Sequence, residues 1–166
     1  AKGIAQGEVH KTELGLVRLN LADWTAVQRA FTDLSSRVGK DGLVLMQKQV
    51  PAGLELIVGL FRDPQFGPGV MVGLGGVYAE VLADKVFAAG PVSESEAMAM
   101  LCRLKNQKLL DGFRGAKPLD RHAAARVIAR VSQLGAAFGR IREIDINPLI
   151  VADGKPIAVD ATIVLG

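Results

Sequence analysis

The sequence predicts an α+β fold, an antiparallel sheet with packed helices, and three observations lead to this prediction. Candidate segments follow one another as strand, helix, a run of strands, two helices and a hairpin, not in strict β-α alternation. The gaps between the central strands are short, which favours antiparallel pairing. Asp153-Gly154 stands between two alternating runs, and this dipeptide is the strongest short-range signal for a β-hairpin.

Apolar periodicity and capping residues predict three helices. The first begins after Asp23, ends at Gly39 and has the apolar stripe Trp24, Val27, Phe31, Leu34 and Val38. The second opens with the capping-box sequence Ser93-Glu94-Ser95-Glu96 and buries Met100, Leu101 and Leu104. Asp120 caps the third, whose stripe is Val127, Ile128, Val131, Leu134 and Phe138.

A β region is expected between the first two helices. Its strands are Leu43–Val50, Leu54–Phe61, Val70–Leu74, Val77–Leu82 and a short Val86–Ala89. Glycines cluster between Gly67 and Gly76, but a strand is expected after them, whereas the glycines of a Rossmann fingerprint open a helix. Close backbone approach explains the cluster, either to another chain segment or to a ligand.

Composition limits the class of protein. A chain of 166 residues, 22% charged and 49% apolar, is typical of a globular domain with its own core. A net charge of +3 and 5% aromatic residues argue against a nucleic-acid surface and suit anionic small molecules such as nucleotides. The single cysteine, Cys102, is expected to be buried and favours a reducing cytoplasm. His122 is expected on the surface. No apolar run reaches the roughly 20 residues of a membrane span.

The C-terminal hairpin carries a candidate metal site. If Asp153-Gly154 is the loop, Ala152 pairs with Lys155 and Asn147 faces Asp160, with Cβ atoms roughly 5 Å apart. Asp145 and Thr162 share that face; the other face carries Ile144, Ile146, Ile157, Val159, Ala161 and Ile163. Oxygen donors in this layout suit a hard cation such as Mg2+ bound beside phosphates. The alternative is a hairpin with one solvated face.

Several short segments carry a family resemblance in their order along the chain. They are His10-Lys11-Thr12-Glu13, Gln47 to Val50 with Gly53 to Gly59, Arg62 to Pro68, Gly73 to Gly76, Gly112 to Gly115, and Asp145 to Val151. Together they resemble the ATP-grasp domain of the ADP-forming acyl-CoA synthetases, relatives of the succinyl-CoA synthetase beta subunit. The resemblance implies an ATP-grasp-like fold, incomplete at the N-terminus. Residues 1–42 would be a remnant of the first subdomain and 43–166 the second subdomain with the hairpin.

The resemblance implies roles for single residues. Asn147 and Asp160 would bind Mg2+, and Asp145 would be a catalytic residue, an acidic side chain beside the metal that can also meet a phosphorylated histidine. The nucleotide, ATP or ADP, would contact Lys2, Gln47, Lys48, Val50, Glu55 and Arg114. His10 would relay phosphate between an acyl-CoA site and ATP, because imidazole is both nucleophile and leaving group near neutral pH. A loop histidine that only forms hydrogen bonds is the alternative.

The implied activity is that of an acid-thiol ligase, which interconverts acyl-CoA, ADP and phosphate with a carboxylate, CoA and ATP. The chain begins at Ala1 without methionine and ends inside an apolar strand, so we expect a piece of a longer polypeptide that is inactive alone. Its partners would be CoA-binding domains or a subunit of the same cytoplasmic enzyme and a small acyl-CoA or carboxylate. Neither nucleic acid nor a membrane is expected, and the parent would be an oligomer. The alternative is a regulatory domain of a protein acetyltransferase without ligase activity.

Overall fold

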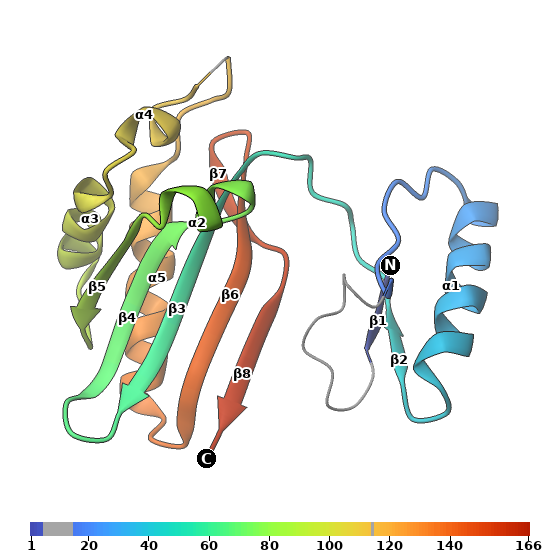
Figure 1. The fold of residues 1–166 in the computed structure, drawn as a ribbon, viewed down its shortest axis with the longest axis horizontal. Helices are drawn as coiled ribbons and strands as arrows, with labels where there is room; N and C mark the ends of the chain where they lie inside the picture. Colours follow the sequence, from blue (N-terminus) through green and yellow to red (C-terminus); the bar gives the residue numbers. More distant parts are fainter. Residues whose placement is uncertain (5–14, 114) are drawn as a thin grey trace. The chain divides into compact units, whose positions relative to one another are not determined.

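The computed structural model describes residues 1–4, 15–113 and 115–166 (Figure 1). The chain divides into two compact units, Ala1–Gln49 and Val50–Gly166. Residues 46–53, which have neither helix nor strand, connect the two. The expected division was between residues 42 and 43. The compact units divide after Gln49, because residues 43–45 form a strand that pairs within the first unit.

The first unit contains one helix and a two-stranded antiparallel sheet. Its elements are β1 (Lys2–Ile4), α1 (Trp24–Val38) and β2 (Leu43–Leu45). The expected strand Leu43–Val50 is therefore much shorter, and it pairs with β1 instead of joining the main sheet. The stripe of α1 is only partly buried, since Leu34 is enclosed while Trp24 and Phe31 are 72% and 51% exposed.

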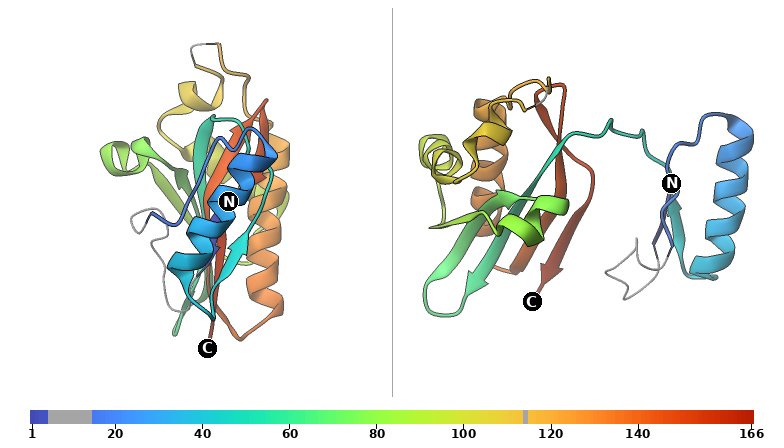
Figure 2. Two further views of the ribbon diagram at one scale, coloured as in Figure 1. Left: turned by 90° about the vertical axis from the view of Figure 1, so that its right-hand side faces the viewer. Right: turned by 45° about the horizontal axis from the view of Figure 1, so that its top comes forward.

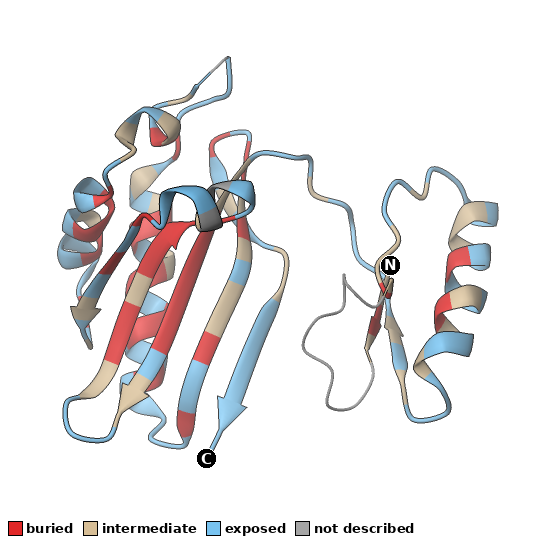
Figure 3. Ribbon diagram, viewed as in Figure 1, coloured by how far each residue is buried: buried red, intermediate tan, exposed pale blue. Residues whose placement is uncertain are grey.

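The second unit contains a six-stranded sheet in which every pairing is antiparallel, as predicted. Its strands are β3 (Leu54–Asp63), β4 (Gly67–Leu74), β5 (Lys85–Ala89), β6 (Ile141–Ala152), β7 (Lys155–Ala158) and β8 (Ala161–Leu165). Their order is β5-β4-β3-β6-β7, and β8 pairs with β6 beyond the end of β7. The central strands β3 and β4 hold much of the buried surface (Figure 3).

The helices of the second unit are α2 (Val77–Leu82), α3 (Glu94–Arg103), α4 (Gln107–Leu110) and α5 (Arg121–Ala137). Helix α5 packs along one face of the sheet with α3 beside it (Figure 2). The core between sheet and helices includes Leu56, Leu60, Val70, Val72, Leu101 and Ile128, all at most 1% exposed. Burial of such side chains is the main stabilising term of the unit.

The predicted helix N-termini are confirmed. Asp23 caps α1 by accepting a hydrogen bond from the Ala26 amide at 2.7 Å. Ser93 and Glu96 form both hydrogen bonds of a capping box at α3. Asp120 caps α5 in the same way as Asp23 caps α1. Short local sequence patterns therefore determine where these helices begin.

Residues Val77–Leu82 form a helix, α2, so the expected strand is wrong. β4 ends at Leu74, whose amide donates to the Asp84 carbonyl at 3.0 Å, and the chain leaves the sheet between these residues. Gly76, with a φ of 57°, is the N-cap. A segment of six residues is too short for periodicity to distinguish helix from strand. The glycine cluster does precede a helix after all.

Two burial predictions are also wrong. Leu134 and Phe138 of the predicted α5 stripe are 38% and 58% exposed, because the helix packs on the sheet through small residues. A Cβ atom added at Gly135 would lie 2.1 Å from Leu60 Cδ1, so the helix approaches β3 closely. Cys102 is exposed, since α3 packs through neighbouring residues instead. His122 is exposed, as expected.

Candidate functional site

The turn between β6 and β7 sets the geometry of the candidate site. Asp153 and Gly154 have φ angles of 55° and 84°, the two positive values that a type I′ hairpin turn requires. Ala152 pairs with Lys155, as predicted. The Asn147 amide donates to the Asp160 carbonyl at 3.2 Å, so these two residues lie opposite each other. The register continues into β8, where Asp145 pairs with Thr162.

The hairpin therefore has the two faces that its alternation predicts. Asp145, Asn147, Asp160 and Thr162 occupy one face, opposite to the face that packs on α5. Gly59 of β3 pairs with Asp145 on its other side and contributes no side chain there. The apolar face is enclosed at β6 but not at the sheet edge. Ile144 is 3% exposed, whereas Ile163 of β8 is 52% exposed.

The electrostatics of this face are set first by the burial of Asp145 and then by the carboxylates near it. Burial is the main cause that raises the pKa of the Asp145 carboxyl above its ordinary value, and the charges of Glu143 and Asp160 raise it further. A hydrogen bond from the Asn147 side chain acts in the opposite direction. A bound cation would relieve this repulsion between like charges.

The donor set fits Mg2+. Asn147 offers an amide oxygen and Asp160 a carboxylate, and Mg2+ prefers oxygen ligands of these kinds. One Asp160 oxygen, Oδ1, accepts a hydrogen bond from the Ala161 amide at 3.1 Å, which orients the carboxylate. In the described part of the chain, no group of three or more His, Cys, Asp or Glu residues is placed to hold a metal ion. Asn147 and Asp160 alone would fill only part of a coordination shell, and Mg2+ commonly takes its remaining ligands from water and phosphate oxygens.

Glu143 is a member of this face that sequence reasoning missed. It pairs with Phe61 on one side and Val164 on the other, and its charge acts on Asp145. The signal was present in the sequence. Strict alternation through Glu143, Asp145 and Asn147 places these polar side chains on one face of a strand.

Glu55 lies beside the glycine-rich turn. Its carbonyl accepts a hydrogen bond from the Gly75 amide at 2.7 Å. A Cβ atom added at Gly76 would lie 2.8 Å from Glu55 Oε2, so the carboxylate rests against the turn. Of the two explanations for these glycines, close approach to another chain segment is confirmed here.

The remaining expected site residues are more scattered. Lys2 lies on β1, opposite Leu45 of the first unit. Gln47 and Lys48 are exposed in the connecting residues after β2, and Val50 is half-buried at the start of the second unit. His10 and Arg114 lie outside the described residues. The structure thus brings together Asp145, Asn147 and Asp160, with Glu55 elsewhere in the same unit.

Comparison with known proteins identifies a family. The profile of the ATP-grasp domain matches residues 2–165. The chain is 37% identical over 163 residues to the beta subunit of ADP-forming acetate–CoA ligase I from Pyrococcus furiosus, covering 95% of this chain and 70% of that subunit. It is 40% identical over 171 residues to ADP-forming acetate–CoA ligase I from Archaeoglobus fulgidus, covering 99% of this chain but only 25% of that protein.

Solved structures give the same result. Acetyl-coenzyme A synthetase 1 from Ca. Korarchaeum cryptofilum, in complex with coenzyme A and Mg-AMPPCP, superposes with a TM-score of 0.84 at 37% identity, covering 100% of this chain and 76% of that one. Its complex with coenzyme A, Ca-AMPCP and HgCl+ gives a TM-score of 0.90 at 38% identity, covering 99% and 75%. The antiparallel sheet, the hairpin and these matches agree, and the chain belongs to the ATP-grasp domain family.

Proposed function

We propose that this chain is the nucleotide-binding part of an ADP-forming acyl-CoA synthetase, an acid-thiol ligase. In that enzyme a phosphoryl group passes between ATP or ADP and a histidine, coupled to acyl-CoA formation. The observation that carries the proposal is the register of the hairpin, which places Asn147 opposite Asp160 with Asp145 on the same face. The named relatives are ADP-forming ligases, which supports this activity over a regulatory role in an acetyltransferase.

Asn147 and Asp160 would hold Mg2+, which when bound neutralises the charge of the nucleotide phosphates. Asp145, in contact with the Asn147 side chain, keeps a carboxylate beside that position. Asp145 is a catalytic residue of the proposal, because its carboxylate can orient the imidazole of a histidine that approaches the phosphate.

The proposal includes further contacts to the nucleotide. Lys2 would supply a mobile point charge for the phosphates, and the backbone from Gln47 to Val50 would hold the adenine ring. His10 would carry the phosphoryl group. The further contacts proposed for the nucleotide are Lys48, Glu55 and Arg114. Residues 1–42 would then represent the end of the first ATP-grasp subdomain and residues 43–166 the second.

The partners proposed for this part are CoA-binding domains or a CoA-binding subunit, with a small acyl-CoA or carboxylate as substrate and an oligomeric parent. The beta-subunit and fused forms among the relatives support such an arrangement. No helix of the described residues has both the length and the apolar character that crossing a membrane requires. The single cysteine supports a cytoplasmic location for the parent enzyme.

The test is an Asp160→Asn substitution in the full-length parent. It keeps the shape of the side chain but removes the charge, and we expect affinity for Mg-ADP to fall by on the order of a few kcal/mol, since charge-assisted contacts are the strong ones. Calorimetric titration with Mg-ADP measures the change, and titration with ADP plus EDTA should show little difference from the wild type. Thr162→Val, on the same face, is the matched control. Unchanged Mg-ADP affinity in Asp160→Asn would refute the assignment.

A further inference from the structure

A row of paired residues crosses the sheet at the candidate site, on the face opposite to α5. Asp145 of β6 pairs with Gly59 of β3, and Gly59 pairs with Met71 of β4 on its other side. Directly paired residues share one face of a sheet, with their Cβ positions roughly 5 Å apart. Gly59 therefore leaves a position without a side chain between the Asp145 carboxylate and the Met71 thioether.

The flexible end of the Met71 side chain covers this position. Among the described residues, apart from the chain neighbours of Gly59, the atoms within 4 Å of a Cβ atom added there are Met71 Cε at 3.3 Å and the Ile144 carbonyl oxygen at 3.6 Å. Gly59 is buried and Met71 is half-buried, so the thioether shields the glycine backbone from water. A methionine side chain has three rotatable bonds and adapts to irregular shapes. The cover over Gly59 can therefore turn aside for a ligand while the sheet stays in place.

A second glycine on the same face shows that an aromatic ring fits such a position. Gly69 of β4 pairs with Phe61 of β3. A Cβ atom added at Gly69 would lie 2.4 Å from Phe61 Cζ and 2.8 Å from each Cε atom, so the end of the ring fills the space of the absent side chain. Gly69 pairs with Ala89 on its other side, whereas Gly59 pairs with Asp145. The position at Gly59 therefore lies beside an acceptor for a ring N–H group.

An imidazole ring has the chemistry that these groups fit. Its faces pack on a glycine backbone, and one of its two nitrogens can donate a hydrogen bond to the Asp145 carboxylate. A thioether sulfur about 5 Å from the ring, at its edge, makes a favourable contact, which Met71 can supply. The Asn147 side chain already donates to Asp145, which restrains the orientation of the carboxylate. Acceptor, floor and side wall are thus supplied by three adjacent strands.

We propose that Gly59 and Met71 form the seat of the imidazole ring that receives the phosphoryl group, with Gly59 as its floor and Met71 as its side wall. The inference rests on the proposed function, in which Asp145 orients this imidazole. One ring nitrogen attacks the γ-phosphorus of ATP, the bond from that phosphorus to the bridging oxygen breaks, and ADP leaves with the electron pair. The proton on the other ring nitrogen stays in the hydrogen bond to Asp145. The seat serves an imidazole whichever histidine carries it.

The experiment uses the full-length parent enzyme with γ-labelled Mg-ATP in single turnovers. An error of about 1 Å in the position of a reacting group costs roughly 100-fold in rate. For Met71→Ala, which removes the wall, and Gly59→Ala, which fills the floor, we expect formation of phosphohistidine to slow roughly 10- to 100-fold. The Kd of Mg-ADP should stay within about threefold of the wild-type value, because the seat contacts the reacting ring and not the nucleotide.

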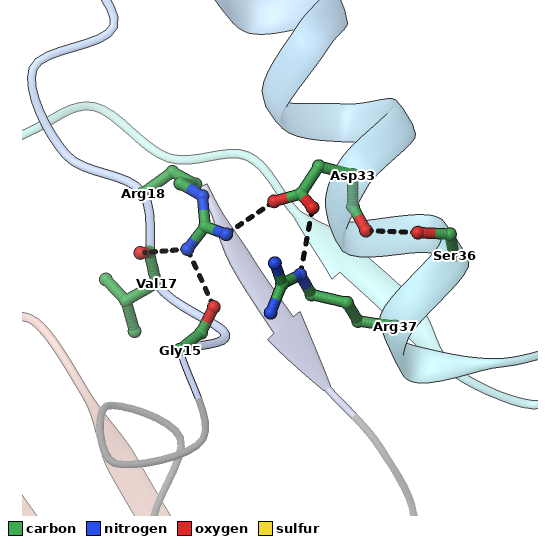
Figure 4. A network of polar contacts seen from close by, with 6 residues as sticks. All are labelled: Gly15, Val17, Arg18, Asp33, Ser36 and Arg37. Atoms are coloured by element: carbon green, nitrogen blue, oxygen red, sulfur yellow. Dashed lines mark hydrogen bonds and ion pairs between the residues drawn. The ribbon is translucent and has the colours of Figure 1, made fainter.

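Three further variants separate the seat from a general loss of stability, and the melting temperature of every variant is recorded. Met71→Leu keeps an apolar side chain of similar volume and should restore most of the rate. Met98→Ala truncates another half-buried methionine, on α3, and should react at the wild-type rate. Asp33→Asn should do the same. It weakens a polar network of the first unit, in which Asp33 accepts hydrogen bonds from Arg18 at 2.5 Å and from Arg37 at 2.9 Å (Figure 4).

The rates of these variants decide the role of the seat. A wild-type rate in either Met71→Ala or Gly59→Ala overturns it, and so does equal slowing in Met98→Ala or Asp33→Asn. Met71→Leu as slow as Met71→Ala, or a parallel loss of Mg-ADP affinity, overturns it as well. Mapping the label identifies the histidine that the seat serves. Label on no histidine of the wild type overturns the proposed function itself, so the two failures are distinct.

Discussion

Asp84 shows how one buried carboxylate joins parts of the chain that lie far apart in sequence. It is 2% exposed and immediately precedes β5. Its Oδ1 accepts a hydrogen bond from the Lys105 amide at 3.0 Å, and its Oδ2 accepts two from Asn106, both at 2.9 Å. Burial alone would raise the pKa of Asp84, but these hydrogen bonds and the charge of Lys105 outweigh it and hold the pKa below its ordinary value.

Replacing Asp84 by Asn should destabilise the second unit in a pH-dependent manner. The folded pKa lies below the unfolded value of about 3.9, so the carboxylate contributes stability above that pH and loses it as the pH falls through the folded pKa. We expect Asp84→Asn to lose about 2 kcal/mol at pH 7, because an amide group cannot accept all three hydrogen bonds. The deficit should shrink below about pH 4, where the wild-type carboxyl is also neutral.

Urea denaturation of both proteins between pH 3 and pH 7 measures this difference. Glu94→Gln, which neutralises an exposed carboxylate on α3, is the control and should show neither the deficit nor its pH dependence. A deficit of equal size at every pH would mean that the charge of Asp84 plays no part.

The role of Asp84 was not predictable from sequence, whereas the turn at Asp153-Gly154 was. The turn is a property of two adjacent residues, and both adopt the positive φ angles that the dipeptide favours. The partners of Asp84 lie 21 and 22 residues away, and no local pattern marks that distance. The expected burial of Cys102 was wrong for a related reason, because its position in an apolar stretch does not determine whether that one side chain faces the core.

At the scale of elements, periodicity predicted that α5 is a helix and predicted only part of the face that it buries. The apolar stripe from Val127 to Phe138 was expected to pack against the core, yet Leu134 and Phe138 are exposed. Ile128 and Val131 of that stripe are buried as predicted, and the rest of the buried face consists of the small residues Ala124, Ala125, Ala129, Ser132 and Gly135. Small residues bring the helix close to the sheet, and a hydrophobicity pattern gives them little weight.

This close packing predicts the effect of Gly135→Ala. In an exposed helix the change stabilises by about 1 kcal/mol, but here the added methyl group meets Leu60 Cδ1 at 2.1 Å inside the core. Arg62 Nη2 also donates to the Gly135 carbonyl at 2.5 Å, which restrains the helix from moving away. We therefore expect a net loss of about 1 to 2 kcal/mol in chemical denaturation.

A double mutant tests the cause of that loss. Leu60→Val removes a methylene group from the contact, so combining it with Gly135→Ala should cost less than the sum of the two single changes. Ala136→Gly, at the exposed neighbouring position, measures how much an exchange between alanine and glycine changes the free energy of unfolding through helix propensity alone. Additive costs in the double mutant would mean that the two side chains do not compete for space.

At the scale of the whole molecule, the two compact units differ greatly in their cores. The second unit holds nearly all of the buried apolar side chains. Among the described residues of the first unit, the buried apolar side chains are those of Leu16, Ala30 and Leu34. A small core gives little stabilisation per residue, so the first unit should open more readily than the second.

Hydrogen exchange of the whole chain, followed by mass spectrometry, should resolve the two units. Leu34→Ala should speed exchange in α1 and the β1–β2 sheet while exchange in the main sheet stays as in the wild type. Leu60→Ala should speed exchange in the main sheet, since truncating a core leucine costs about 2 to 5 kcal/mol. Faster exchange in both units after either substitution would show that the chain unfolds as a single cooperative body.

Sequence predicted the candidate metal pair because its two members are joined by one hairpin. Asn147 and Asp160 are related by a turn and a regular ladder, and both follow from local rules. The helix at Val77–Leu82 and the division of the chain after Gln49 depend on which segments pair at a distance. Such pairings come from the tertiary packing of the whole unit, and local propensity does not contain them.

The unbroken register of the hairpin has a consequence for insertions and deletions. From the pair Ala152–Lys155 to the pair Ile144–Ile163, β6 keeps one register with its partners β7 and β8. The length of the turn therefore sets which residues pair throughout this stretch. A one-residue shift of this register, caused by one extra residue in the turn, would move the Asp160 side chain to the other face of the sheet, away from Asn147. Every original residue would still be present. The site therefore depends on the length of this stretch, and a tag or linker is better placed at residues 64–66, between β3 and β4.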